Sequence, residues 1–174
     1  MHRLILLRHA KSDWPEGVAD HERPLNGRGR RAAPLMGAAM AERGYVPERA
    51  LVSSARRTQE TWALARTAAP ALPAGLEEAR LYHASVGMLM TVIGQASEKT
   101  TSLALVGHNP GIEALAAGLV VEGPPAQWRR LSAKYPTGAL AVIDCDIARW
   151  RDIRPKCGRL ITFLTPRDLD GEAE

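Results

Sequence analysis

Short apolar runs alternate with amphipathic segments along most of the chain. The first run, Leu4 to Leu7, is aliphatic at every position, which is typical of a strand covered on both faces. Comparable runs recur at intervals further along. The pattern predicts strands at 4–7, 50–53, near 79–81, 102–107, 139–144 and 159–164.

Helix signals fill the intervals between these strands. Asn26 can cap a helix that Gly44 ends, and Pro34 predicts either a kink or a helix that begins only near that proline. Further helices are expected over 54–69, over 86–96 with Ser85 as cap, and after Asn109 and Pro110 as cap and first-turn proline.

This alternation predicts a three-layer α/β/α sandwich with a mostly parallel central sheet. The two last predicted strands are expected to close one edge of the sheet in antiparallel fashion. The chain has 174 residues, which suits one domain, so we expect a single domain over 1–174. The final "DGEAE" is typical of a frayed tail.

Composition narrows the classes of protein. The sequence is 45% hydrophobic and 24% charged, and no apolar run approaches the roughly 18 residues that cross a membrane. We therefore expect a cytoplasmic protein without membrane association. Cys145 and Cys157 lack the spacing of a metal site or a redox pair, so neither a disulfide nor structural zinc is predicted.

The basic charge balance raises the question of a nucleic-acid partner. The net charge is +4, but no run reaches the five or six like charges of a basic arm. Only one Phe is present to support a stacking surface, which disfavours nucleic acid. Arginine in a pocket suits phosphate instead, because its planar fork binds two oxygens at once.

Polar side chains follow three of the predicted strands. Arg8 and His9 end the first, Arg57 lies just after the second, and His108 ends the strand at 102–107. Carboxyl ends of parallel strands meet at one edge of a sheet, and helix amino termini begin at the same edge. The sequence therefore predicts a phosphate pocket there.

The residue types in this predicted pocket indicate phosphoryl transfer. A neutral imidazole is a competent nucleophile toward phosphorus, which assigns this role to His9. Arg8 and Arg57 would clamp the phosphoryl oxygens, and His108 would donate a hydrogen bond to them. No carboxylate cluster indicates a metal, so neither a metal site nor a cofactor is expected.

Three segments resemble the signatures of the histidine phosphatase superfamily, also called phosphoglycerate mutase-like: "LLRHAKS", "SSARRTQET" and "LVGHNPG". The first family motif is usually written RHG. The resemblance places His9 at the phosphorylated position with Arg8 beside it, selects Arg57 rather than Arg56, and matches His108 to the second histidine. It implies a phosphoglycerate mutase-like fold. The short chain looks most like the SixA-type phosphohistidine phosphatases.

The sequence departs from the family pattern at two places. Ala10 replaces the usual glycine, which suggests that the backbone there needs no positive φ. The glutamate that serves larger members as proton donor has no clear counterpart, and the candidates are His83, Glu77 and Glu78. Because an alkoxide leaves poorly without a proton, this favours phosphoramidates or other activated substrates.

Three further residues are candidates for substrate binding. Ser12 follows the predicted nucleophile closely and can contact phosphate through its hydroxyl. Arg23 has a counterpart at the pocket rim in SixA-like proteins, although a surface ion pair with Asp20 explains it nearly as well. Asn109 is a candidate as well, and its alternative role is that of a helix cap.

These observations predict a cofactor-independent phosphatase that acts through phosphorylated His9. The favoured substrate is phosphohistidine on a partner protein, such as a phosphotransfer domain. A small-molecule or sugar phosphomonoesterase, acting on a small phosphorylated metabolite, is the alternative among enzymes. A binding module that reads phosphate without turnover is the alternative outside them.

Overall fold

A seven-stranded sheet forms the middle of the molecule in this computed structural model, which describes residues 1–170. Its strands are β1 (His2–Arg8), β2 (Arg49–Val52), β3 (Gly75–Glu77), β4 (Ser102–Gly107), β5 (Val120–Glu122), β6 (Leu140–Cys145) and β7 (Gly158–Leu164). Their order is β3-β2-β4-β1-β6-β7-β5. Only β6 runs against its neighbours, so the sheet is mostly parallel.

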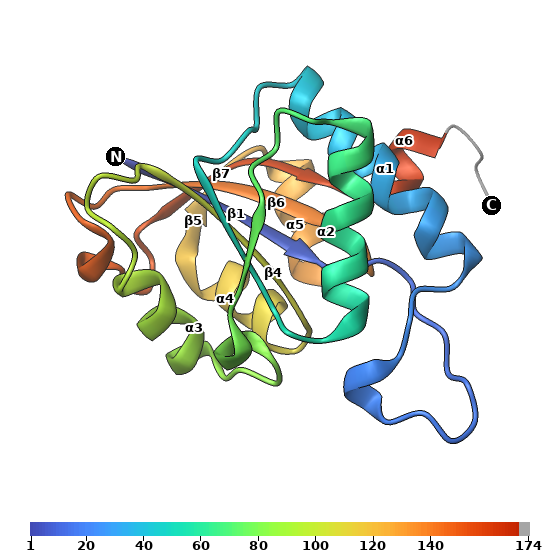
Figure 1. Cartoon of the computed structure of the whole chain (residues 1–174). Helices are drawn as coiled ribbons and strands as arrows, with labels where there is room; N and C mark the ends of the chain where they lie inside the picture. Colours follow the sequence, from blue (N-terminus) through green and yellow to red (C-terminus); the bar gives the residue numbers. More distant parts are fainter. Residues whose placement is uncertain (171–174) are drawn as a thin grey trace.

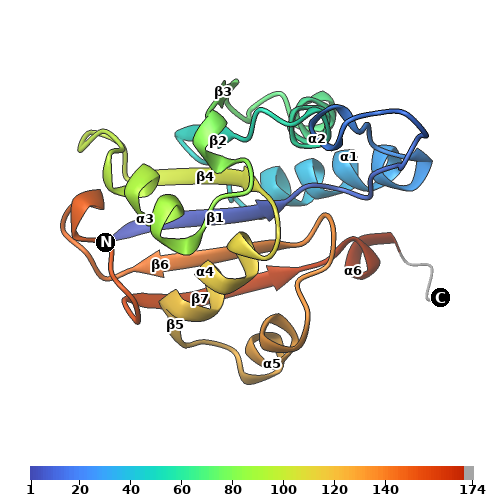
Figure 2. The same cartoon turned by 90° about the horizontal axis from the view of Figure 1, so that it is seen from below.

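Helices cover both faces of the sheet (Figures 1 and 2). The α-helices are α1 (Gly27–Glu42), α2 (Arg56–Ala68), α3 (Val86–Gly94), α4 (Gly111–Leu119), α5 (Pro125–Ala133) and α6 (Pro166–Asp170). Single 3₁₀ turns are η1 (Asp20–Glu22), η2 (Ala79–Leu81) and η3 (Trp150–Asp152). The predicted three-layer α/β/α class is confirmed.

The alternation of side chains along β1 explains why its aliphatic run is continuous. Leu4 and Leu6 pack into the core under α3, α4 and α5, whereas Ile5 and Leu7 pack into the core under α1 and α2. All four side chains are fully buried. A central strand with a helix layer on each face needs apolar groups at every position.

The predicted strand near 79–81 is wrong. These residues form η2, and the strand lies earlier, at β3. β3 is exposed at every position, so its sequence lacks the apolar pattern of a buried strand. Leu81 is buried in the core, and this apolar position led to the prediction of a strand at 79–81. The carboxylate of Glu78 accepts a hydrogen bond from the Arg80 N–H and starts the 3₁₀ turn.

Two predicted helix starts have different outcomes. The Asn26 side chain accepts a hydrogen bond from the Gly29 N–H, so α1 begins before Pro34 and continues through it. A start near Pro34 is therefore wrong. Asn109 does not cap α4, which begins at Gly111, because the Asn109 amide instead donates to the Tyr135 carbonyl.

Elements near the carboxyl end differ from expectation in two further ways. β6 and β7 pair antiparallel as expected, but the edge of the sheet is β5, which the sequence pattern did not predict. Helices α5 and α6 were also missed. The expected frayed tail lies outside the described residues except for Asp170, which ends α6. Within residues 1–170, no helix has the length and apolar character of a membrane span.

The close approach of α1 to α2 yields a stability prediction. A Cβ atom at Gly37 would clash with the backbone carbonyl of Ala65, so Gly37→Ala should lower the free energy of unfolding by about 1–3 kcal/mol. A Cβ atom at Gly118 in α4 would lie in open space, so Gly118→Ala should raise the free energy of unfolding by up to about 1 kcal/mol. Urea unfolding measures both, and equal effects of the two substitutions would contradict this packing.

Candidate active site

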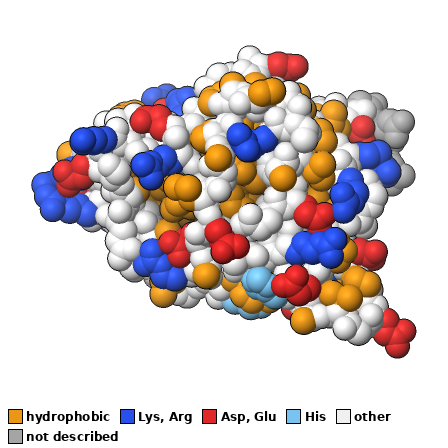
Figure 3. Space-filling model, in the orientation of Figure 1, with side chains coloured by type: hydrophobic (Ala, Val, Ile, Leu, Met, Phe, Trp, Pro, Cys, Tyr) orange, Lys and Arg blue, Asp and Glu red, His pale blue; other side chains and the backbone are white. Residues whose placement is uncertain are grey.

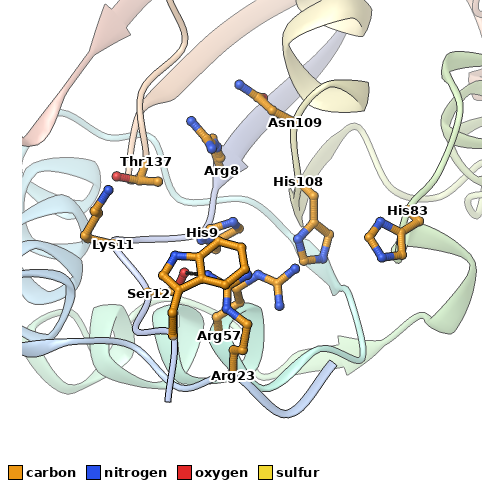
Figure 4. A pocket seen from close by; sticks show the side chains of 11 residues that line it. Arg8, His9, Lys11, Ser12, Arg23, Arg57, His83, His108, Asn109 and Thr137 are labelled. Carbon is orange, nitrogen blue, oxygen red and sulfur yellow. Dashed lines mark hydrogen bonds between the residues drawn. The ribbon is translucent and has the colours of Figure 1, made fainter. Parts of the chain in front are cut away.

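A polar cavity of about 220 Å³ lies at the carboxyl ends of β1 and β4 (Figure 4). The residues that line it are Arg8, His9, Lys11, Ser12, Trp14, Arg23, Arg57, His83, His108, Asn109 and Thr137. The structure thus brings together the residues that the sequence assigned to the phosphate pocket and to substrate binding, which are Arg8, His9, Ser12, Arg23, Arg57, His108 and Asn109, and it adds His83 from the three candidate proton donors. They come from segments up to about a hundred positions apart, and the parallel sheet joins them.

Strand pairing delivers the two histidines to the same place. Arg8 is paired with Gly107 across the β1–β4 ladder, and the His9 N–H donates to the Gly107 carbonyl at 3.0 Å. His108 follows directly. The rings of His9 and His108 therefore lie with centroids 5.3 Å apart and tilted by 53°.

His9 is held neutral with one nitrogen free. Its Nδ1 lies 2.8 Å from the Ala10 carbonyl oxygen. A carbonyl can only accept, so Nδ1 carries the proton and Nε2 keeps its lone pair. Burial lowers the pKa of His9 to about 4, and the charges of Arg57, Arg8 and Arg23 act in the same direction. A neutral imidazole with a free lone pair can attack an electrophile without prior deprotonation.

The backbone beside His9 accepts alanine without strain. Ala10 is fully buried and does not adopt a positive φ, and its N–H donates to the Thr61 hydroxyl at 3.0 Å. The small side chain fits where the family usually has glycine.

His108 is also neutral. Burial lowers its pKa to about 3, helped by the neighbouring His9 and Arg57. Its Nε2 forms a hydrogen bond of 2.8 Å with the Ser53 hydroxyl, and its buried Nδ1 has no protein partner. A neutral imidazole still carries one N–H, so His108 can donate one hydrogen bond to an oxyanion.

Two guanidinium groups, one of them buried, face the histidines. Arg57 is only 4% exposed, and its Nη1 and Nη2 donate to the backbone carbonyl and carboxylate of Asp20 at 2.7 and 3.1 Å. Arg8 donates through Nη1 to the Tyr135 carbonyl at 2.9 Å. The Nε atoms of both arginines are buried without a protein partner. Both groups therefore retain unused donors for an anion.

Asp20 lies at the centre of a hydrogen-bond network at the site, and sequence reasoning considered it only as a surface partner of Arg23. Its carboxylate accepts hydrogen bonds from the Tyr82 hydroxyl at 2.5 Å, Arg23 Nη1 at 2.9 Å and Arg57 Nη2 at 3.1 Å. The Tyr82 bond and the two guanidinium groups hold the pKa of Asp20 far below its usual range. Asp20 orients two arginines and cannot donate a proton near neutral pH.

Both interpretations of Arg23 hold together. The side chain lines the cavity and is 6% exposed, and it also pairs with Asp20. Its Nη2 donates to the Ser12 hydroxyl at 2.5 Å. Ser12, which is also a predicted substrate-binding residue, is therefore connected through Arg23 to the Asp20 carboxylate. Arg23 therefore lines the cavity and also pairs with the partly exposed Asp20 carboxylate.

Of the three candidates for the proton donor, only His83 lines the cavity. His83 lines the cavity, with Nε2 3.6 Å from the Asp20 carboxylate and a left-handed backbone at φ 53°. Glu78 is bound to Arg80, and Glu77 lies on the exposed strand β3. Neither glutamate lines the cavity. Among residues 1–170, no group of metal-ligating side chains is arranged to hold a metal ion.

Comparison with known proteins places this architecture in a family. Residues 4–82 match the model of the histidine phosphatase superfamily, branch 1. A crystal structure from Agrobacterium tumefaciens, assigned as a phosphohistidine phosphatase SixA, is 31% identical with a TM-score of 0.79 and covers 95% of this chain and 98% of its own. The chain belongs to the histidine phosphatase superfamily and is of the SixA type.

Two further matches show that membership of this family does not identify the substrate. An uncharacterized protein of Mycobacterium tuberculosis is 39% identical over 163 residues, covering 92% of this chain and all of its own length. A mycobacterial glucosyl-3-phosphoglycerate phosphatase shares only 15% identity with a TM-score of 0.65 over 93% of this chain and 98% of its own. That likeness concerns the phosphoglycerate mutase-like fold alone.

The lowered pKa of His108 predicts a pH-dependent stability. The unfolded histidine takes up a proton below about pH 6.5, whereas the folded one resists until about pH 3, so acidification favours unfolding. Between pH 7 and 5 this group alone should cost about 2 kcal/mol. His108→Asn should therefore lose less stability over that interval in urea titrations. Equal losses in both proteins would refute the burial effect.

Proposed function

We propose that this chain is a phosphatase that transfers a phosphoryl group to His9 and then to water, with phosphohistidine on a protein as its substrate. The observation that carries the proposal is the unprotonated Nε2 of His9 inside a cavity walled by guanidinium groups. A nucleophile and a fixed set of cations meet at one point, which is what phosphoryl transfer requires.

The reaction proceeds in two displacements. In the first, the His9 Nε2 lone pair attacks phosphorus, the bond from phosphorus to the substrate nitrogen breaks, and the departing imidazole takes a proton from solvent. In the second, water attacks the phosphohistidine, the bond to Nε2 breaks, and inorganic phosphate leaves. Arg8 and Arg57 neutralise charge on the phosphoryl oxygens through their unused donors, and His108 donates to one oxygen.

The ionised state of the carboxylate beside the cavity supports a phosphoramidate as substrate. The carboxylate that adjoins the cavity, Asp20, stays ionised because of its three donors. Hydrolysis of an alkyl ester needs a proton on the leaving oxygen, whereas an N–P bond is more labile. The likeness to a protein assigned as a SixA phosphohistidine phosphatase supports the same substrate class.

One observation favours the second candidate, a small-molecule or sugar phosphomonoesterase. His83 lies in the cavity wall, and histidine is the side chain best suited to exchange a proton near neutral pH. If His83 protonates the leaving oxygen, esters become substrates as well. Comparison of substrates decides between the two.

The direct test compares turnover of a phosphohistidine protein, a phosphoserine peptide and sugar phosphates by wild-type protein and His9→Ala. We expect wild type to prefer phosphohistidine and His9→Ala to lose turnover entirely, because no other group lies at the nucleophile position. A brief reaction with labelled substrate, stopped in base, should leave label on His9 of the wild type.

Three outcomes would contradict this proposal. Phosphate binding without turnover of any substrate would favour the binding module. Preference for sugar phosphates would favour the phosphomonoesterase. Turnover that requires an added divalent cation would overturn the mechanism.

Two adjacent arginines provide a matched test of the clamp. Arg57→Lys keeps the charge but loses the fork that bonds two oxygens, so kcat/KM should fall roughly 100-fold. Arg56 is adjacent but half exposed, and pairs with Glu60 outside the cavity. Arg56→Lys should therefore retain wild-type kinetics. Comparable losses in both variants would place the clamp elsewhere.

A further inference from the structure

The mouth of the cavity carries an aromatic ring that the fold does not bury. Trp14 lines the cavity, yet it is 74% exposed. It belongs to the loop between β1 and α1, which projects from the body of the molecule in Figure 1, and Figure 3 shows hydrophobic side chains gathered on this projection. A large aromatic ring that lines a cavity and is not covered by the core is available to contact a ligand.

The ring is nevertheless held in place. The Arg23 guanidinium carbon lies 3.2 Å from the centroid of the Trp14 ring, as a cation–π contact. Arg23 is itself fixed, because it donates to the Asp13 carbonyl, the Ser12 hydroxyl and the Asp20 carboxylate. The guanidinium occupies one face of the indole. The high exposure of the ring leaves the other face free.

Geometry relates this free face to the leaving group. The phosphoryl group must reach His9, which is 7% exposed and lies deep in the cavity, so the rest of the substrate extends toward the mouth. The first part of the substrate beyond phosphorus is the group that leaves. In phosphohistidine this group is a planar imidazole, which leaves as a neutral aromatic ring once it has taken up a proton, and aromatic rings pair favourably in offset-stacked arrangements.

We propose that Trp14 binds the leaving group of the substrate by stacking its free indole face on a planar ring, and that this selects phosphohistidine over phosphoramidates without a ring. This inference rests on the proposed function. It makes Trp14 a specificity residue in addition to the proposed nucleophile His9 and the arginines that bind the phosphoryl group. It also gives Arg23 a second role, because Arg23 holds the Trp14 ring in place.

The test compares two substrates that share an N–P bond and differ in the ring: phosphohistidine and phosphoramidate. Trp14→Leu keeps an apolar side chain without a π face, and Trp14→Phe keeps the face. We expect the ratio of kcat/KM for phosphohistidine to that for phosphoramidate to fall at least fivefold in Trp14→Leu, mainly through KM. In Trp14→Phe the ratio should stay within about twofold of wild type.

A matched control comes from the same loop. Val18 is 40% exposed and does not line the cavity, so Val18→Ala should keep the wild-type ratio. An unchanged ratio in Trp14→Leu would overturn the inference, as would an equal fall in Val18→Ala or Trp14→Phe. Failure of the proposed function looks different, because wild type would then not hydrolyse phosphohistidine, and both ideas would fall together.

Discussion

The hydrogen bond from His9 Nδ1 to the Ala10 carbonyl is the interaction on which the site depends. It fixes the tautomer, so the lone pair lies on Nε2. Burial and the positive charges of Arg8, Arg23 and Arg57 keep the ring neutral, with a pKa of about 4. The cations that would bind a phosphoryl group thus add to the effect of burial, and both lower the pKa of His9.

Cations packed this closely need a counter-charge, and Asp20 provides it. Its carboxylate and backbone carbonyl accept from Arg57, and its second oxygen accepts from Arg23. The Tyr82 hydroxyl completes the shell. Asp20 thereby sets the direction of both guanidinium groups while leaving the cavity positive. Because these hydrogen bonds keep the Asp20 carboxyl group ionised, it cannot serve as an acid, and this supports the proposed preference for phosphoramidates.

Much of this arrangement follows from local sequence. The continuous aliphatic run before Arg8 predicts a central strand, and polar residues at the ends of parallel strands must meet at one edge. His9 and His108 could therefore be brought together before any coordinates. Asp20 could not, because its partner Tyr82 is 62 positions away and follows an exposed strand without an apolar pattern. The capping role predicted for Asn109 was wrong for a similar reason, since the hydrogen-bond partner of its side chain is the distant Tyr135 carbonyl.

The state of His9 can be observed directly by nitrogen NMR of histidine-labelled protein across a pH series. The account predicts an Nδ1–H tautomer at neutral pH and protonation only near pH 4. An Nε2–H tautomer, or a titration midpoint near the ordinary value of about 6.5, would contradict it.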